Sequence, residues 1–225
     1  MPCDQMPRGV YGVLLNFHGA LARLTGAFNS PPYNKPPCAP ILYIKPANTW
    51  SPPGAAIPVP AGAKIIQSGA TIGIVIGRTA TRVSEASALD YVSGLVVVND
   101  WCLAHQDYYR PAIKQRCRDG FCSIGSEIVD TGSAHDLLHI SIRTYVNGEL
   151  RREARTGELV RPIPQLIADV SDFMTLMPGD ILQIGVAEDP PTAGVGDFVR
   201  VEADRIGSIE NAVVRGSDGP EGVGP

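Results

Sequence analysis

The sequence predicts a mixed, mainly β fold of the α+β class, and two observations support this. The 225 residues include 24 glycines and 20 prolines, which separate short apolar runs. These runs do not alternate regularly with helical patterns, as they would in a doubly wound sheet. We expect one domain over residues 8–215, with disordered ends at 1–7 and 216–225, because the polar, glycine-rich tail has too little apolar surface to fold.

Composition excludes several classes of protein. The net charge of −4 gives no electrostatic reason to expect binding to nucleic acid or to a membrane surface. Apolar runs such as Leu95–Val98 are far shorter than the roughly 20 residues of a membrane-spanning helix, and the N-terminus lacks the apolar segment of a signal peptide. Five irregularly spaced cysteines indicate reduced thiols. We therefore expect a cytoplasmic protein.

Short apolar runs predict the first strands, at residues 11–17, 41–46, 56–60 and 68–77. In the last of these, Ile72, Ile74 and Ile76 alternate with smaller apolar residues, which is typical of a buried strand. Between the first two runs, residues 29–40 contain too many prolines for regular structure and predict an irregular loop.

The middle of the chain predicts a helix, a strand and a hairpin. Ser84 is a helix-start signal and Gly94 a stop signal, and the apolar run "LVVVND" that follows predicts a strand ending at Asp100. In "HISIRTYVNGELRREA", Ile140, Ile142 and Val146 alternate toward one face, and Asn147-Gly148 suits a type I′ turn, which predicts a hairpin.

The C-terminal third predicts one helix and three strands. From Pro164 onward, apolar residues recur at helical spacing, and "MPGD" (177–180) follows with Pro and Gly placed for a type II turn. Strands are expected at "ILQIG" (181–185), "DFVRVEA" (197–203) and "SIENAVV" (208–214).

A dense polar cluster follows the strand that ends at Asp100, and it is the best candidate for a functional site. Catalytic groups often follow strand ends because a rigid element fixes their position. A carboxylate there could bind Mg²⁺, and basic side chains suit substrates that carry carboxylates. The alternative is that Asp100 caps the next turn and the basic residues form a solvated surface. The cluster includes His105, Tyr109, Arg110, Lys114, Arg116 and Arg118.

Three segments resemble the fumarylacetoacetate hydrolase family in order and spacing. They are "IGIVIGRTATRVSEASALDYVSGLVVVNDW", "YYRPAIKQRCRDGFCSIG" and "FMTLMPGDILQIG", and the resemblance extends from Tyr11 to Val214. "IKPANT" and "YYRPAIKQRCRDGFC" are similar to one branch, the N-terminal half or subunit of enzymes that degrade 4-hydroxyphenylacetate.

The resemblance implies a mixed β-roll and a shared chemistry. Members hold Mg²⁺ or Mn²⁺ with a Glu-x-Glu pair and a later Asp, and the ion acts as a Lewis acid on a 2-oxo or 2-hydroxy-enoate unit. In this branch the implied reactions are decarboxylation of 5-oxopent-3-ene-1,2,5-tricarboxylate and isomerisation of 2-hydroxyhepta-2,4-diene-1,7-dioate.

The chain departs from the family pattern at the metal ligands. Gly69 and Thr71 stand at the two Glu positions, so only Asp100 matches a ligand. Arg116 stands where members carry a lysine and keeps the charge, although it does not transfer protons near neutral pH. We therefore expect no metal bound by this chain, with Mg²⁺ or Mn²⁺ held instead by a possible partner subunit.

The resemblance and the polar cluster together assign candidate roles. The expected catalytic residues are Asp100, His105 and Arg116, and the expected substrate-binding residues are Tyr109, Arg110, Lys114 and Arg118. The substrate is expected to be a small polycarboxylate. The first hypothesis is one component of the decarboxylase/isomerase, as a homo-dimer or a hetero-oligomer with a metal-bearing paralogue. The alternatives are a non-catalytic partner of that paralogue and a stand-alone dicarboxylate-binding module.

Overall fold

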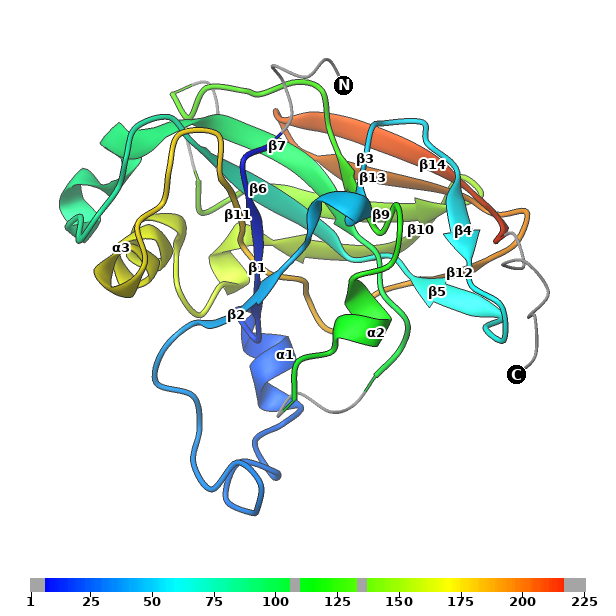
Figure 1. The fold of residues 1–225 in the computed structure, drawn as a ribbon, viewed down its shortest axis with the longest axis horizontal. Helices are drawn as coiled ribbons and strands as arrows, with labels where there is room; N and C mark the ends of the chain where they lie inside the picture. Colours follow the sequence, from blue (N-terminus) through cyan, green and yellow to red (C-terminus); the bar gives the residue numbers. More distant parts are fainter. Residues whose placement is uncertain (1–6, 106–109, 133–136, 217–225) are drawn as a thin grey trace, which may run out of the picture.

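The computed structural model describes residues 7–105, 110–132 and 137–216, which form curled β-sheets with a few helices (Figure 1). The larger sheet is mixed, because β1 pairs with β11 in parallel and the neighbouring pairs β1–β2 and β11–β6 are antiparallel. In spatial order its strands are β2 (Ile41–Ile44), β1 (Val10–Leu14), β11 (Ile181–Gln183), β6 (Ala70–Ile76), β7 (Val92–Asp100), β8 (Cys122–Ile124) and β3 (Trp50–Ser51).

A second sheet packs against the first, and a small two-stranded sheet lies at one side. The second sheet contains β10 (Glu149–Arg155), β9 (Ser141–Val146), β13 (Phe198–Ala203), β14 (Gly207–Arg215) and β4 (Ile57–Val59). The two-stranded sheet pairs β12 (Thr192–Gly194) with β5 (Ile65–Gln67). This arrangement confirms the predicted mainly β fold of the α+β class.

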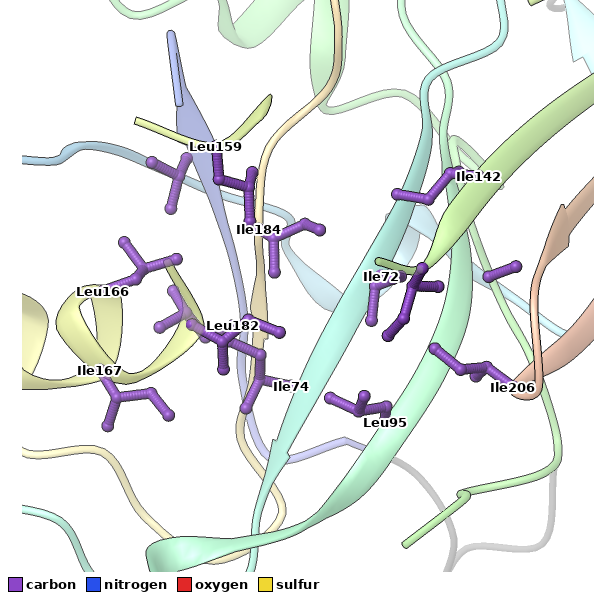
Figure 2. Packing of buried hydrophobic residues seen from close by; sticks show 14 of the residues in the cluster. Ile72, Ile74, Leu95, Ile142, Leu159, Leu166, Ile167, Leu182, Ile184 and Ile206 are labelled. Carbon is purple, nitrogen blue, oxygen red and sulfur yellow. The ribbon is translucent and has the colours of Figure 1, made fainter. Parts of the chain in front are cut away.

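The main hydrophobic core lies between the sheets and under the helix α3 (Ile163–Phe173). In Figure 2, Leu166 on α3 lies beside Leu182 of β11, and Ile74 of β6 is close by. The other face of the larger sheet buries a separate cluster that includes Val75 and Val98. Because β6 and β7 are covered on both faces, their sequences are nearly continuous apolar runs.

Most of the predicted elements are confirmed. The hairpin β9–β10 turns at Asn147-Gly148, where both residues have the positive φ values (52° and 81°) of a type I′ turn. Gly179 in "MPGD" has φ +88°, and the Asp180 amide donates to the Met177 carbonyl at 2.9 Å, as in a type II turn.

Two predictions are wrong in detail. The helix predicted from Ser84 is present as a 3₁₀ helix (Glu85–Tyr91), in which the Ser84 side chain makes no capping bond. Gly94 does not end a helix; it lies inside β7, where the close approach of Val129 leaves no room for a Cβ. The first strand ends at Leu14, because Leu15 adopts φ 59° and breaks the extended run before Phe17.

In the part of the chain described, no helix is long and apolar enough to cross a membrane.

Candidate active site

A cavity of about 590 Å³ opens beside the ends of β1, β2 and β7. Two short helices, α1 (His18–Ala22) and α2 (Ile113–Arg116), lie at this end of the molecule, in the lower part of Figure 1. The polar and charged residues that line the cavity are Arg23, Tyr43, Gln67, Asp100, His105, Arg116, Glu188 and Asp189.

Asp100 is fully buried at the end of β7, and three side chains surround its carboxylate. Lys45 Nζ lies 2.6 Å from Oδ1, Arg116 Nη1 donates to Oδ2 at 3.0 Å, and the Tyr43 hydroxyl donates to the same Oδ2. Burial alone would raise the pKa of Asp100, but the two cations outweigh it and hold the pKa below its usual value. Asp100 is therefore an ionised carboxylate and a weak base, and it does not cap the turn that follows.

Lys45 directly follows β2, and it is fully buried. Besides its ion pair with Asp100, its ammonium donates to the carbonyls of Arg116 (2.7 Å) and Trp101 (3.1 Å). A buried ammonium needs such partners, because an unpaired charge in a protein interior is costly. The sequence predictions missed Lys45, although a lysine at the end of an apolar strand was a usable signal.

Arg116, at the end of α2, links Asp100 to the other side of the cavity. Its side chain is buried, with the guanidinium carbon 4.6 Å from the centre of the Tyr43 ring. Its Nε donates to Nε2 of His105 at 3.2 Å. In this contact Nε2 of His105 is the acceptor, so its lone pair faces Arg116.

Tyr43 was also missed by the sequence predictions, because in the sequence it is simply one residue of an apolar strand. Its ring lies over Gly12 on the adjacent strand β1, where any side chain would collide with the ring. Burial, followed by the nearby Asp100 carboxylate, raises the pKa of Tyr43 well above its usual value. Tyr43 therefore remains a protonated phenol.

The other predicted binding residues are placed less centrally. Arg110 and Lys114 are exposed, Arg118 is half-buried, and none of them lines the cavity. Arg118 Nε donates to the Lys114 carbonyl at 3.0 Å. Tyr109 lies outside the described residues. The rim of the cavity carries a different basic residue, Arg23, which pairs with Asp189.

The residues present do not fit the divalent metal that the family implies. At Gly69 a Cβ would collide with the Asp100 carbonyl oxygen and approach Val186 Cγ2 to 3.0 Å, so a Glu side chain has no room there. The Thr71 hydroxyl is used in a buried 2.6 Å hydrogen bond to the Gly185 carbonyl. Within residues 7–105, 110–132 and 137–216, no three His, Cys, Asp or Glu side chains are grouped to hold a metal ion. One carboxylate that is already paired with two cations is a poor Mg²⁺ site.

The curled mixed sheet, with a charged cavity at its strand ends, belongs to a known class of folds. The family model described as "Fumarylacetoacetate (FAA) hydrolase C-terminal" matches residues 9–214. The chain therefore belongs to the fumarylacetoacetate hydrolase family.

Individual relatives give a finer comparison. The chain is 38% identical over 205 residues to a 4-hydroxyphenylacetate degradation bifunctional isomerase/decarboxylase of Escherichia coli, covering 91% of this chain and 47% of that protein. It thus spans about half the length of that relative.

Solved structures agree on the fold. A 5-carboxymethyl-2-hydroxymuconate delta-isomerase from Mycobacterium smegmatis superposes with a TM-score of 0.78 at 28% identity, covering 95% of this chain and 81% of that one. A maleylpyruvate hydrolase from Sphingobium sp. SYK-6, solved with manganese(II) and pyruvate, has a TM-score of 0.79 at 26% identity, covering 95% and 72%.

Proposed function

We propose that the chain is the metal-free component of a decarboxylase/isomerase of 4-hydroxyphenylacetate catabolism, and that it isomerises 2-hydroxyhepta-2,4-diene-1,7-dioate. The observation that carries this proposal is the cluster of charged side chains around Asp100, which lines the cavity. Lys45 and Arg116 bring two positive charges against the single negative charge of Asp100. The two other carboxylates that line the cavity, Glu188 and Asp189, are each paired with an arginine. The excess positive charge at Asp100 therefore favours a substrate with carboxylates, and Arg116 is the group best suited to bind one.

Isomerisation needs only proton transfer, which the cavity can supply without a metal. The O–H bond on C2 breaks and C2=O forms, the two C=C bonds become one between C3 and C4, and C5 gains a proton. We assign both transfers to His105: a substrate carboxylate draws Arg116 Nε away from Nε2, and the released Nε2 lone pair takes the hydroxyl proton and returns one to C5. Asp100, whose carboxylate is a weak base, holds Arg116 and Lys45 in place.

A second candidate function is a non-catalytic partner of a metal-bearing paralogue. The missing carboxylates at Gly69 and Thr71 favour it, as does the match to about half of the E. coli relative. In that case the cavity would have no catalytic role, and the chain would act by pairing with the metal-bearing subunit.

An activity assay of the purified chain alone separates the two candidates. We expect turnover of 2-hydroxyhepta-2,4-diene-1,7-dioate that EDTA does not reduce, and we expect Asp100→Asn to lower it at least tenfold, as loss of a charged partner in a site commonly does. Asp90→Asn, an exposed aspartate outside the cavity, is the matched control and should change nothing. No turnover by the chain alone, together with tight co-purification with a metal-bearing paralogue, would instead establish the partner role.

A further inference from the structure

Tyr43 lines the cavity, and the proton transfers above give its hydroxyl no role. We propose that Tyr43 is a catalytic residue whose hydroxyl donates a hydrogen bond to the C2 oxygen of the substrate as negative charge develops there. The inference rests on the proposed function, and it deepens that function by naming the group that stabilises the reacting oxygen.

The hydroxyl is already aimed at a negatively charged oxygen. In the structure, Tyr43 and Arg116 Nη1 both donate to Oδ2 of Asp100, so two donors converge on one point of the cavity. A C2 oxygen placed beside that point by the substrate's neighbouring carboxylate would meet the phenol. Donors that are aligned before the reaction need no reorganisation during it, which is the source of their catalytic effect.

The Tyr43 ring is held rigidly enough for this task. The β1 backbone at Gly12 packs directly under the ring, and the Arg116 guanidinium carbon lies 4.6 Å from the ring centre. The phenol keeps its proton, because burial and the neighbouring carboxylate raise its pKa. It therefore acts as a hydrogen-bond donor and does not enter the proton balance of the isomerisation.

The transfer of this hydrogen bond from Asp100 to the substrate leaves no buried charge without a partner. When the phenol turns to the C2 oxygen, the Asp100 carboxylate still faces Lys45 Nζ at 2.6 Å and Arg116 Nη1 at 3.0 Å. Loss of both cations would be costly for a fully buried carboxylate, whereas loss of one neutral donor is modest.

The test compares Tyr43→Phe with the wild type in two measurements on the full chain. Oxalate, a planar mimic of the enolate of a 2-oxo acid, is the binding probe, and calorimetry measures its Kd. We expect Tyr43→Phe to weaken oxalate binding about tenfold, and to lower kcat by about 100-fold with little change in KM, as removal of one such donor does. Tyr145→Phe on β9, whose ring contacts Arg200 instead, is the matched control and should alter neither value.

The oxalate titration and the turnover assay separate failure of the Tyr43 inference from failure of the proposed function. Unchanged oxalate affinity in Tyr43→Phe overturns the inference whether or not the wild type turns over the diene, and so does a wild type that does not bind oxalate. A wild type that binds oxalate without turnover contradicts the proposed function, while weaker binding by Tyr43→Phe still supports Tyr43 as the oxygen-binding donor. Phe retains the ring between Gly12 and Arg116, so thermal unfolding should remain close to that of the wild type and thereby confirm a folded variant.

Discussion

At the scale of single residues, Lys45 determines the charge balance around the buried Asp100 carboxylate. The substitution Lys45→Met removes the ammonium next to Asp100 Oδ1, and among the described residues Arg116 then remains as the cation on that carboxylate. We expect a loss of about 3–5 kcal/mol in the free energy of unfolding, measured by urea denaturation, as is typical when one partner of a buried ion pair is removed.

Two further variants make this prediction specific. Adding Asp100→Asn to Lys45→Met should restore part of the loss, because the unpaired charge is then removed as well. Lys64→Met, at an exposed lysine, should change stability by less than about 0.5 kcal/mol. Equal losses in the free energy of unfolding for Lys45→Met and Lys64→Met would show that the ion pair between Lys45 and Asp100 does not stabilise the fold.

Gly69 is the residue at which the structure explains the absence of a family ligand. A Cβ there would collide with the Asp100 carbonyl oxygen, so Gly69→Ala should force β6 and the end of β7 apart. We expect a destabilisation of about 1–3 kcal/mol, typical of overpacking, detected as a lower Tm. Gly26→Ala is the control, since nothing lies within 4 Å of its Cβ, and its Tm should be unchanged. A fully stable Gly69→Ala would refute the steric explanation.

At the scale of elements, the sequence predicted best where the signal is local. The hairpin β9–β10 follows from Asn147-Gly148, and α3 follows from apolar residues at helical spacing. The strands β3, β5, β8 and β12 were not predicted, because they contain only two or three residues and form through pairing with distant strands. The 3₁₀ helix Glu85–Tyr91 shows the limit of a local signal, which predicted a helix there but not its type.

The helix α3 closes one side of the main core and gives a prediction at this scale. Leu166 is fully buried among residues of that core (Figure 2), so Leu166→Ala should cost about 2–5 kcal/mol through lost burial and the cavity left behind. Asp172→Ala on the exposed face of the same helix is the control, with a change below about 0.5 kcal/mol expected. Urea denaturation of both variants checks the difference, and similar values would contradict the described packing.

At the scale of the whole molecule, sheet topology assembles the site from segments that are distant in sequence. Asp100 and Arg116 were accessible to sequence reasoning, since they follow one strand end in a polar cluster. Tyr43 and Lys45 were not, because they lie more than 50 residues earlier and reach Asp100 only through the strand order of the larger sheet. Pairing between distant strands is poorly encoded in local sequence, so the fold was more predictable than the site.

The central claim is that this cavity works with the protein's own cations and takes no divalent metal. Calorimetric titration of the chain with Mn²⁺ tests it most directly, with Asp100→Asn as the companion variant. We predict no stoichiometric binding to either protein, because the Asp100 carboxylate already faces Lys45 and Arg116, and the positions of Gly69 and Thr71 supply no further carboxylate. A one-site isotherm with a micromolar Kd that disappears in Asp100→Asn would contradict the claim.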